Sequence, residues 1–448
     1  MPRSGGTGRV VSRVPRRPST RSALSPKRPG FRSWLDSPDL RWARRLVVVT
    51  TALALLAVAC SDGGGSEQSQ TTTTVPGSTA ATTAPTTTPK KIDTIPGMPD
   101  VPDPSNLYSE TATGKMSEAV KNALPRVYVP NRASNTVSVI DPSTMKVVDT
   151  FDVGLNPQHV VPSWDLKTLW VTNNAEGTTD GTLTPIDPAT GKPGASVKVD
   201  DPYNMYFTPD GKYAINVAEA RKRLDFLDPH TMAVQSSLDV PDCAGVNHAD
   251  FTIDGRYVIF TCEFQGSLVK IDVLNRSVVG YLRLSQGGMP QDIRSSPDGT
   301  TFYVAEMMRG GVYTIDPNSF TETGFIPTGI GTHGLYPSRD GTKLYVANRG
   351  SSQVGGPPGG PGSVSVIDFA TKAVIVTWPI PGGGSPDMGN VSADGKVLWL
   401  SGRYDDVVYA IDTTSGNVTK IPVGKEPHGL TVWPQPGRYS LGHTGNMR

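Results

Sequence analysis

Hydrophobic and polar residues alternate along most of this chain in short runs that are separated by turn-forming residues. One such run recurs seven times and ends in an aliphatic residue followed by aspartate. The seven pairs are Ile140-Asp141, Ile186-Asp187, Leu227-Asp228, Ile271-Asp272, Ile315-Asp316, Ile367-Asp368 and Ile411-Asp412. Successive aspartates lie 41 to 52 residues apart, which is the length of one four-stranded propeller blade. The pattern therefore predicts an all-β fold, a seven-bladed β-propeller.

The order of signals within each repeat predicts how the ring closes. A tight Asp-Gly turn such as Asp210-Gly211 separates the inner strand of a blade from the second, because glycine accepts positive φ. The chain enters the repeats at a second strand, residues 126–130, and leaves them with an inner strand, residues 428–433. We therefore expect a propeller over residues 126–438 in which the C-terminal inner strand completes the N-terminal blade, so that no sheet edge stays open.

The segments before the repeats have a different composition. Residues 1–45 carry twelve basic and two acidic residues, and an apolar run over 46–59 leads to Cys60. This layout resembles a bacterial lipoprotein signal, which implies a signal peptide over 1–59, lipidation at Cys60 and export to the outer side of the cytoplasmic membrane. The alternative is ordinary secretion without the lipid. A Thr/Pro-rich stalk (60–91) and a lead-in segment (92–125) follow, and residues 439–448 form a tail.

The overall charge of +1 hides an acidic folded part, because twelve basic and only two acidic residues lie in the first 45 positions and leave the remainder with a net negative charge. An acidic surface argues against nucleic acid as a partner. The expected partners are a small molecule or an envelope protein, together with the membrane through the anchor at Cys60.

The repeats resemble those of YVTN-type, YncE-like propellers. The residues that carry the resemblance are Leu344-Tyr345-Val346-Ala347-Asn348 followed by Val364-Ser365-Val366-Ile367-Asp368, with a Gly-x-x-Pro loop at 154–157. The resemblance implies the propeller fold. It implies little about chemistry, because such propellers include nucleic-acid binders, lactonases, redox-cofactor carriers and structural surface proteins.

Alignment of the starts of the inner strands predicts a site at the channel mouth, where polar residues of most blades converge. The ligand-binding candidates are His159, Asn204, His248, Asp292, His333, Asp387 and His428. The metal-binding candidates are His159, His248, His333 and His428, since imidazoles suit Zn, Cu or Fe. His230 and His443 are expected outside the ring on the surface. The competing interpretation is a water-filled funnel without a function, and no cofactor is indicated.

The only thiols beyond Cys60 are Cys243 and Cys262, which we expect to pair as a disulfide in an exported protein. Alternatively, they form a soft copper site with His248 and Met289. The function that these features favour is an envelope-tethered binding or scaffold propeller. A lactonase-like hydrolase is one alternative, and a redox or metal protein that holds copper or haem is another. The catalytic candidates for the hydrolase are Glu306, His333, Arg349 and Arg403.

Overall fold

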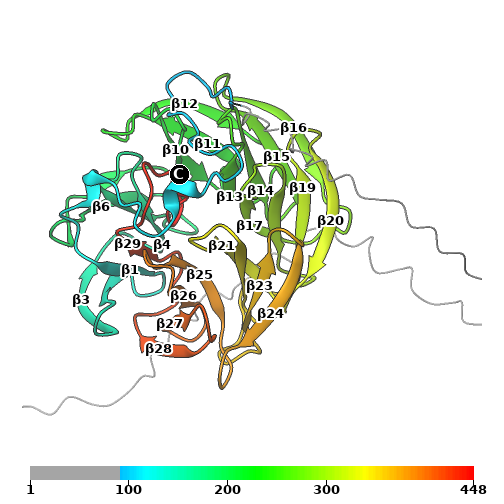
Figure 1. Cartoon of the computed structure of the whole chain (residues 1–448). Helices are drawn as coiled ribbons and strands as arrows, with labels where there is room; N and C mark the ends of the chain where they lie inside the picture. The colour runs from blue at the N-terminus through cyan, green and yellow to red at the C-terminus, as the bar shows by residue number, and fades with distance from the viewer. Residues whose placement is uncertain (1–90) are drawn as a thin grey trace, which may run out of the picture. The chain divides into compact units, whose positions relative to one another are not determined.

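The computed structural model describes residues 91–448 and shows seven β-sheets arranged as blades around one axis (Figure 1). The predicted signal peptide, Cys60 and all but the last residue of the stalk lie outside the described residues. Within residues 91–448, no helix is long and apolar enough to cross a membrane. We number the blades from the one that contains β1.

Each blade runs from an inner strand at the axis to an outer strand at the rim. The inner strands are β29 (Thr431–Trp433), β4 (Pro157–Pro162), β9 (Pro202–Phe207), β13 (Val246–Phe251), β17 (Pro290–Ser295), β21 (Thr332–Pro337) and β25 (Pro386–Val391). The second strands are β1 (Arg126–Asn131), β5 (Leu169–Asn173), β10 (Ala214–Ala218), β14 (Tyr257–Cys262), β18 (Phe302–Glu306), β22 (Lys343–Asn348) and β26 (Val397–Gly402).

The third strands carry the aliphatic-Asp pairs at their ends: β2 (Thr136–Asp141), β6 (Thr182–Asp187), β11 (Arg223–Leu227), β15 (Ser267–Asp272), β19 (Gly311–Asp316), β23 (Ser363–Asp368) and β27 (Val407–Asp412). The outer strands are β3 (Lys146–Asp152), β7 (Lys192–Pro193) with β8 (Val197–Lys198), β12 (Val234–Asp239), β16 (Ser277–Arg283), β20 (Thr321–Pro327), β24 (Ala373–Pro379) and β28 (Val418–Pro422). The predicted all-β, seven-bladed fold is confirmed.

Ring closure is also confirmed. Strand β29 pairs antiparallel with β1, with Val127 opposite Val432, and this joins the C-terminal strand to the N-terminal blade. In Figure 1 the red end of the chain meets the cyan first blade at this point. The inner edge of the N-terminal blade is therefore covered by the same chain.

The two residues of the recurring aliphatic-Asp pair have different structural roles. The aliphatic residue is buried between blades, as Ile367 shows. The aspartate ends the strand, and its carboxylate accepts backbone N–H groups of the following turn, as Asp368 does from Thr371 at 2.8 Å. Such local bonds make aspartate a preferred residue at turns. Burial decreases outward, since β4 is buried throughout whereas β3 is half exposed.

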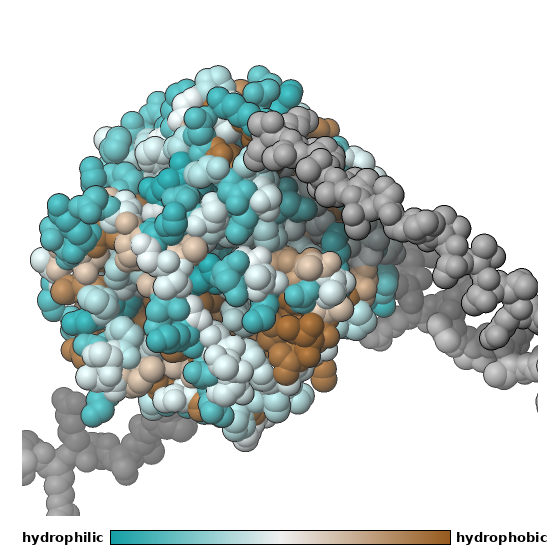
Figure 2. Space-filling model, in the orientation of Figure 1, coloured by the Kyte–Doolittle hydropathy of each residue, from teal (hydrophilic) through white to brown (hydrophobic). Residues whose placement is uncertain are grey.

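The lead-in segment lies across the face that carries the Asp-Gly turns. Its backbone N–H groups donate to turns of different blades, Ile95 to the carbonyl of Asp254 at 3.1 Å and Leu107 to that of Pro297 at 2.7 Å. It contains two single-turn helices, η3 (Ser109–Thr111) and η4 (Glu118–Val120). Figure 2 shows that this face is mainly hydrophilic, with small scattered apolar patches.

The C-terminal tail departs most from the prediction. Residues 438–448, which we call the C-terminal hairpin, fold back on themselves through a bridge between Ser440 and Met447. The hairpin enters the channel and pairs with the inner edge of β9, where the N–H of His443 donates to the carbonyl of Met205 at 2.8 Å. His443 is completely buried, so its expected place on the surface is wrong. His230 is exposed, as predicted.

Candidate functional site

A repeated irregularity in the inner strands concentrates polar side chains in the channel. In blades 2 to 7 the pairing register of the inner and second strands shifts by one residue near their mouth ends. In blade 4, Asn247 and His248 together lie opposite the single residue Thr261. A bulge of this kind re-aims side chains that would otherwise alternate between two faces. Neighbouring residues of one strand can therefore both face the axis.

Five of the six histidines of the chain gather at this axis, and the structure divides them between two clusters. The first contains His159, His248 and His443, and the second contains His333 and His428 with Asp387. Within each cluster the potential ligand atoms lie within 4.8 Å of one another. The four histidines predicted as one metal set thus separate into two pairs, and each pair gains a further donor.

The first cluster, here called the three-His cluster, has imidazole nitrogens without partners. Two others contact each other: Nε2 of His159 and Nε2 of His248 lie within hydrogen-bond distance, 3.4 Å apart. The other nitrogen of His159, Nδ1, lies 2.9 Å from the carbonyl oxygen of Tyr203, so it is the protonated one and leaves a lone pair on Nε2. Nδ1 of His248 and Nε2 of His443 are buried and accept or donate no hydrogen bond. Unpartnered buried polar atoms are uncommon and call for an explanation.

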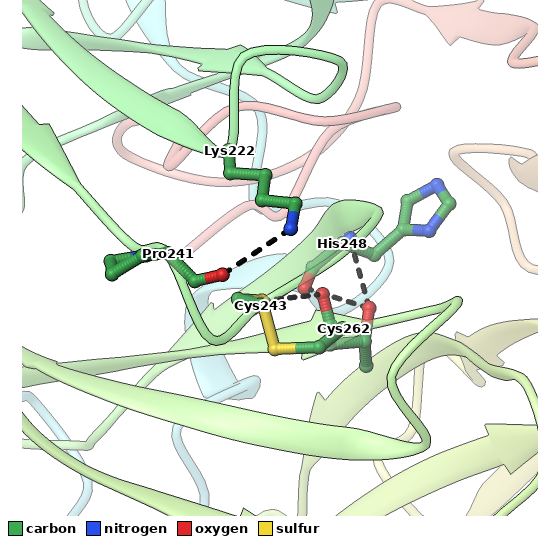
Figure 3. The surroundings of a disulfide bond; sticks show 6 residues. Lys222, Pro241, Cys243, His248 and Cys262 are labelled. Atoms are coloured by element: carbon green, nitrogen blue, oxygen red, sulfur yellow. Dashed lines mark hydrogen bonds between the residues drawn. A yellow bond between two sulfur atoms is a disulfide. The ribbon is translucent and has the colours of Figure 1, made fainter. Parts of the chain in front are cut away.

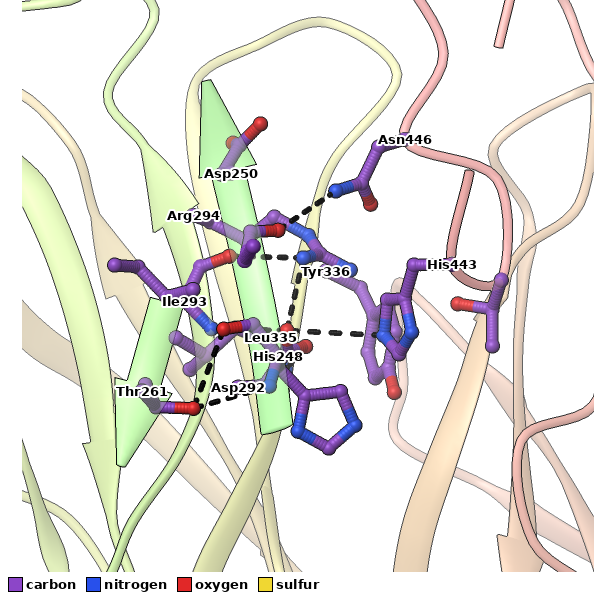
Figure 4. Close-up of polar contacts among 12 residues, drawn as sticks. His248, Asp250, Thr261, Asp292, Ile293, Arg294, Leu335, Tyr336, His443 and Asn446 are labelled. Carbon is purple, nitrogen blue, oxygen red and sulfur yellow. Dashed lines mark hydrogen bonds and ion pairs between the residues drawn. The ribbon is translucent and has the colours of Figure 1, made fainter. Parts of the chain in front are cut away.

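The ring of His443 is held by two neighbours from different blades. Its Nδ1 accepts a hydrogen bond from the amide nitrogen of Asn204 at 2.9 Å, so the neutral ring carries its proton on Nε2. Nε2 lies 3.7 Å from Oδ1 of Asp292, too far for a hydrogen bond (Figure 4). Asp292 in turn accepts from Arg294 at 2.8 Å and from the N–H of Leu335 at 2.9 Å. Burial raises the pKa of Asp292 to about 6 despite these partners. The predicted ligand-binding residues Asn204 and Asp292 therefore border the three-His cluster.

The second cluster satisfies its own hydrogen bonds. The guanidinium of Arg349 pairs with both carboxylate oxygens of Asp387, at 2.8 and 3.2 Å. Nδ1 of His333 lies 2.9 Å from the same carboxylate, and Nε2 of His428 lies 3.6 Å from it. Burial opposes ionisation of Asp387, but Arg349 and His333 outweigh it and hold its pKa well below the usual range. This cluster is an internally balanced charge network.

Burial keeps the imidazoles neutral. Removal from water lowers the pKa of His159 to about 3 and that of His333 to about 4. The pKa values of His248, His428 and His443 are also well below the ordinary value, again mainly because of burial. Neutral imidazole is the form that can donate a lone pair to a metal ion.

Glu306 does not belong to the site. The residues that follow the second strands, such as Glu263 and Arg349, reach toward the axis, where Glu263 accepts from Asn247 at 2.7 Å. Glu306 is the last residue of β18, one position earlier, and side chains of successive strand residues point to opposite faces. Its carboxylate accepts backbone N–H groups of its own blade, those of Met289 at 2.7 Å and Arg309 at 2.6 Å. Glu306 stabilises loops.

Of the remaining catalytic candidates, Arg349 has its guanidinium paired with the carboxylate of Asp387. Arg403 follows β26 on the mouth side, and its Nη1 is buried without a hydrogen-bond partner. His333, Arg349 and Arg403 thus lie near Asp387, where their charges influence one another, and Glu306 is the member of the proposed acid–base set that is elsewhere.

The structure joins Cys243 and Cys262 in a disulfide near His248, one member of the three-His cluster (Figure 3). This pairing leaves no free thiol for the alternative copper site with His248 and Met289, and that alternative is wrong. The bond links the loop before β13 to the end of β14. The preceding residue of β14, Thr261, has its hydroxyl 3.1 Å from the backbone nitrogen of His248. The disulfide thus fixes the backbone that carries His248.

The family model of the YNCE-like β-propellers matches residues 98–436. The chain belongs to this family. The match covers all seven blades but not the C-terminal hairpin. Among curated proteins, none matches the sequence significantly.

Several solved structures share the architecture. A putative 6-phosphogluconolactonase from Bacteroides uniformis has a TM-score of 0.55 at 16% identity and covers 68% of this chain and 98% of that one. A functionally unknown protein from Desulfotomaculum acetoxidans has a TM-score of 0.54 at 15% identity, with coverage of 68% and 98%. Dihydro-heme d1 dehydrogenase NirN in complex with DHE has a TM-score of 0.51 at 15% identity, with coverage of 68% and 75%. At these identities the likeness concerns the fold alone.

Proposed function

We propose that this protein is a metal-binding propeller of the cell envelope, tethered through Cys60, which holds one divalent transition-metal ion in the three-His cluster. The observation that carries the proposal is the convergence of His159, His248 and His443, all completely buried, where Nδ1 of His248 and Nε2 of His443 have no hydrogen-bond partner and Nε2 of His159 faces only Nε2 of His248. Buried imidazoles without hydrogen bonds are costly unless something binds them.

The spacing of the nitrogens supports coordination. Two nitrogen ligands at about 2.0–2.1 Å from a tetrahedral ion are separated by about 3.4 Å. Nε2 of His159 and Nε2 of His248 already lie 3.4 Å apart. A potential ligand atom of His443 lies within 4.8 Å of those of both. Because Nδ1 of His443 accepts from Asn204, the ring must give up this hydrogen bond and move its proton from Nε2 to complete a three-nitrogen site.

The donor set favours Zn²⁺ or Cu²⁺, which bind imidazole nitrogen well. The contact of His159 with the carbonyl of Tyr203 is typical of metal-binding histidines, whose second nitrogen is usually held by a carbonyl or carboxylate. Haem fits poorly, because imidazole centroids 4.8 to 5.4 Å apart leave no room for a macrocycle between them. The lactonase-like alternative loses support because Glu306 is engaged by backbone N–H groups.

Titration of the full chain with Zn²⁺ and Co²⁺ tests the proposal. Calorimetry should give one ion per chain, and Co²⁺ should show the visible absorption of a tetrahedral nitrogen site. His248→Asn should abolish tight binding, whereas His230→Asn, which removes the exposed histidine, should bind as wild type does. Circular dichroism checks that both variants are folded. Binding that His248→Asn leaves unchanged, or no binding in wild type, would overturn the proposal.

A further inference from the structure

The channel mouth carries charged groups that the three-His cluster does not use. One residue follows the second strand of each blade at this end. In order from blade 1, these residues are Arg132, Asn174, Glu219, Glu263, Met307, Arg349 and Arg403. In a ring of seven, blade 7 with Arg403 faces the junction of blades 3 and 4, which carry Glu219 and Glu263. Figure 1 shows β26 and β10 on opposite sides of the ring. The mouth therefore has a basic side and an acidic side.

We infer that the mouth binds a small organic zwitterion, whose carboxylate pairs with the guanidinium of Arg403 and whose ammonium group is held by Glu219 and the side-chain oxygen of Asn247. This site goes beyond the proposed function, because it takes a different ligand and does not require an ion in the three-His cluster.

Arg403 is the arginine at the mouth that has no partner. Arg349 pairs with Asp387, and Arg132 forms ion pairs with two glutamates. Arg403 is half-buried, and within residues 91–448 its guanidinium forms no hydrogen bond or ion pair. A guanidinium carries five N–H donors, and withdrawing them from water without acceptors is costly. A carboxylate matches the fork of these donors, so the basic side favours a ligand with that group.

Glu219 is the corresponding group on the acidic side. It is half-buried, and its carboxylate receives no hydrogen bond and forms no ion pair in the part of the chain that the structure describes. Burial and the nearby carboxylates of Glu263, Asp201 and Glu176 raise the pKa of Glu219 well above its usual value. A cation at this point stabilises the ionised carboxylate. The acidic side therefore favours an ammonium group.

Asn247 adds a neutral acceptor on the same side. Its side chain is completely buried, its amide nitrogen donates to Glu263 at 2.7 Å, and its Oδ1 has no donor. Acceptors without donors thus lie on blades 3 and 4, and donors without acceptors lie on blade 7. A molecule with an ammonium group and a carboxylate satisfies both sides, whereas an ion of one sign satisfies only one.

The ring of Tyr203 lies between these two sides. Its centroid is 5.4 Å from that of His159, 6.1 Å from that of His248 and 6.4 Å from that of His428, so it reaches the axis. Tyr203 precedes Asn204 in β9, just as the residues before His159 and His248 precede them, so it lies nearer the mouth than the three-His cluster. The hydroxyl of Tyr203 forms no hydrogen bond to any described residue and is a further polar group for the ligand.

Calorimetry of the full chain in EDTA, with ω-amino acids as probes, tests the inference. The series from glycine to 6-aminohexanoate separates an ammonium group and a carboxylate by an increasing number of methylene groups. We expect one member to bind with a stoichiometry of one, at least about ten-fold more tightly than the alkylamine and the carboxylate of the same length. If no member binds, or if the alkylamine binds as tightly as the amino acid, the inference is wrong.

Two variants test the assigned residues. Arg403→Met and Glu219→Gln should each weaken binding of that amino acid about 10- to 100-fold, because each removes one charged partner. The matched controls are Arg256→Met and Glu118→Gln, which change exposed residues outside the mouth and should bind as wild type does. Circular dichroism checks that all four variants are folded.

Arg403→Met should also abolish the advantage of the amino acid over the alkylamine, which a general loss of structure does not imitate. An unchanged advantage would overturn the assignment of Arg403. Because EDTA removes metal ions from the assay, the two sites fail separately. Amino-acid binding without Zn²⁺ binding overturns the metal function alone, and Zn²⁺ binding without amino-acid binding overturns this inference alone.

Discussion

The ion pair between Arg349 and Asp387 provides a quantitative test of the buried charge network around Asp387. Both side chains are buried, at 4% and 0% exposure, and two hydrogen bonds of 2.8 and 3.2 Å join them. Replacement of Arg349 by Met keeps the length and most of the apolar volume of the side chain but removes the charge. The buried carboxylate of Asp387 then loses its main partner.

Removing one member of a buried pair costs about 3–5 kcal/mol of the free energy of unfolding, because the remaining charge is left in a poor solvent. We expect a loss in this range for Arg349→Met at pH 8. The exposed pair between Arg221 and Asp200 has a similar distance of 3.1 Å, with the side chains 48% and 40% exposed. Arg221→Met should therefore cost less than about 1 kcal/mol and serves as the matched control.

The cost of Arg349→Met should shrink in acid. His333 protonates only near pH 4 in the wild type, mainly because of burial and also because of Arg349. Its folded pKa lies below the unfolded one, so wild-type stability is lost as the pH falls from about 6.5 through about 4. Without Arg349 the pKa of His333 rises, and the imidazolium can replace the lost charge beside Asp387. The variant therefore loses less stability on acidification.

Urea unfolding followed by tryptophan fluorescence at pH 8.0 and 5.5, in EDTA, measures these free energies. The double variant with Asp387→Leu removes both charges and should be more stable than Arg349→Met alone. The reasoning fails if Arg349→Met costs no more than Arg221→Met, or if the difference from wild type increases at pH 5.5.

Three further predictions concern residues around the channel. Replacing both Cys243 and Cys262 by Ala should lower the free energy of unfolding by about 3 kcal/mol, since the bond spans 19 residues, and equal urea midpoints of the variant and the wild type would contradict this. Glu306→Gln should cost about 1–3 kcal/mol in the same assay and leave Zn²⁺ affinity unchanged, so that a loss of affinity would return Glu306 to the site. Gly429→Ala would place its Cβ against Cδ2 of His159, so the imidazole must move, and should weaken Zn²⁺ binding about 10- to 100-fold by calorimetry. Unaltered affinity would show that His159 is not a ligand.

The fold could be predicted because each blade repeats the same local signals. The aliphatic residue before each aspartate had to be buried, and the Asp-Gly turns had to be tight, so every repeat indicated the same unit. Ring closure could be predicted because the first blade lacks an inner strand and the chain ends with one. That last inner strand can therefore pair only with β1. These inferences depend on short-range chemistry that a sequence displays directly.

The site could be predicted only in part. The histidines of the inner strands were found because they occupy matching positions in the repeats, but the bulges that turn neighbouring residues toward the axis leave no sequence signal. Glu306 was misplaced by one position, and in a strand one position reverses the direction of the side chain. Asn348 is the last residue of β22 and Arg349 is the first residue after it. Glu306 corresponds to Asn348 rather than to Arg349, because it is the last residue of β18.

His443 was missed for a different reason. The C-terminal hairpin has no alternating pattern, and its burial depends on backbone pairing with β9 and on the room inside the ring. The side chains of Tyr439, Leu441 and Met447 are also buried in the hydrophobic core, but three apolar residues at irregular spacing give no strand or helix signal. The one available signal was that residues 442–446 place a histidine between glycine and threonine, next to a second glycine, which indicates a tight turn. Export and lipidation at Cys60 stay predictions, because that part of the chain lies outside the described residues.

Anomalous diffraction from crystals of the full chain grown with Zn²⁺ tests the central claim most directly. Data collected on both sides of the zinc edge should show one strong peak among the imidazoles of His159, His248 and His443, with the C-terminal hairpin ordered beside it. A peak at His333, Asp387 and His428 instead, or no peak in the channel of a protein that binds Zn²⁺ in solution, would contradict the account.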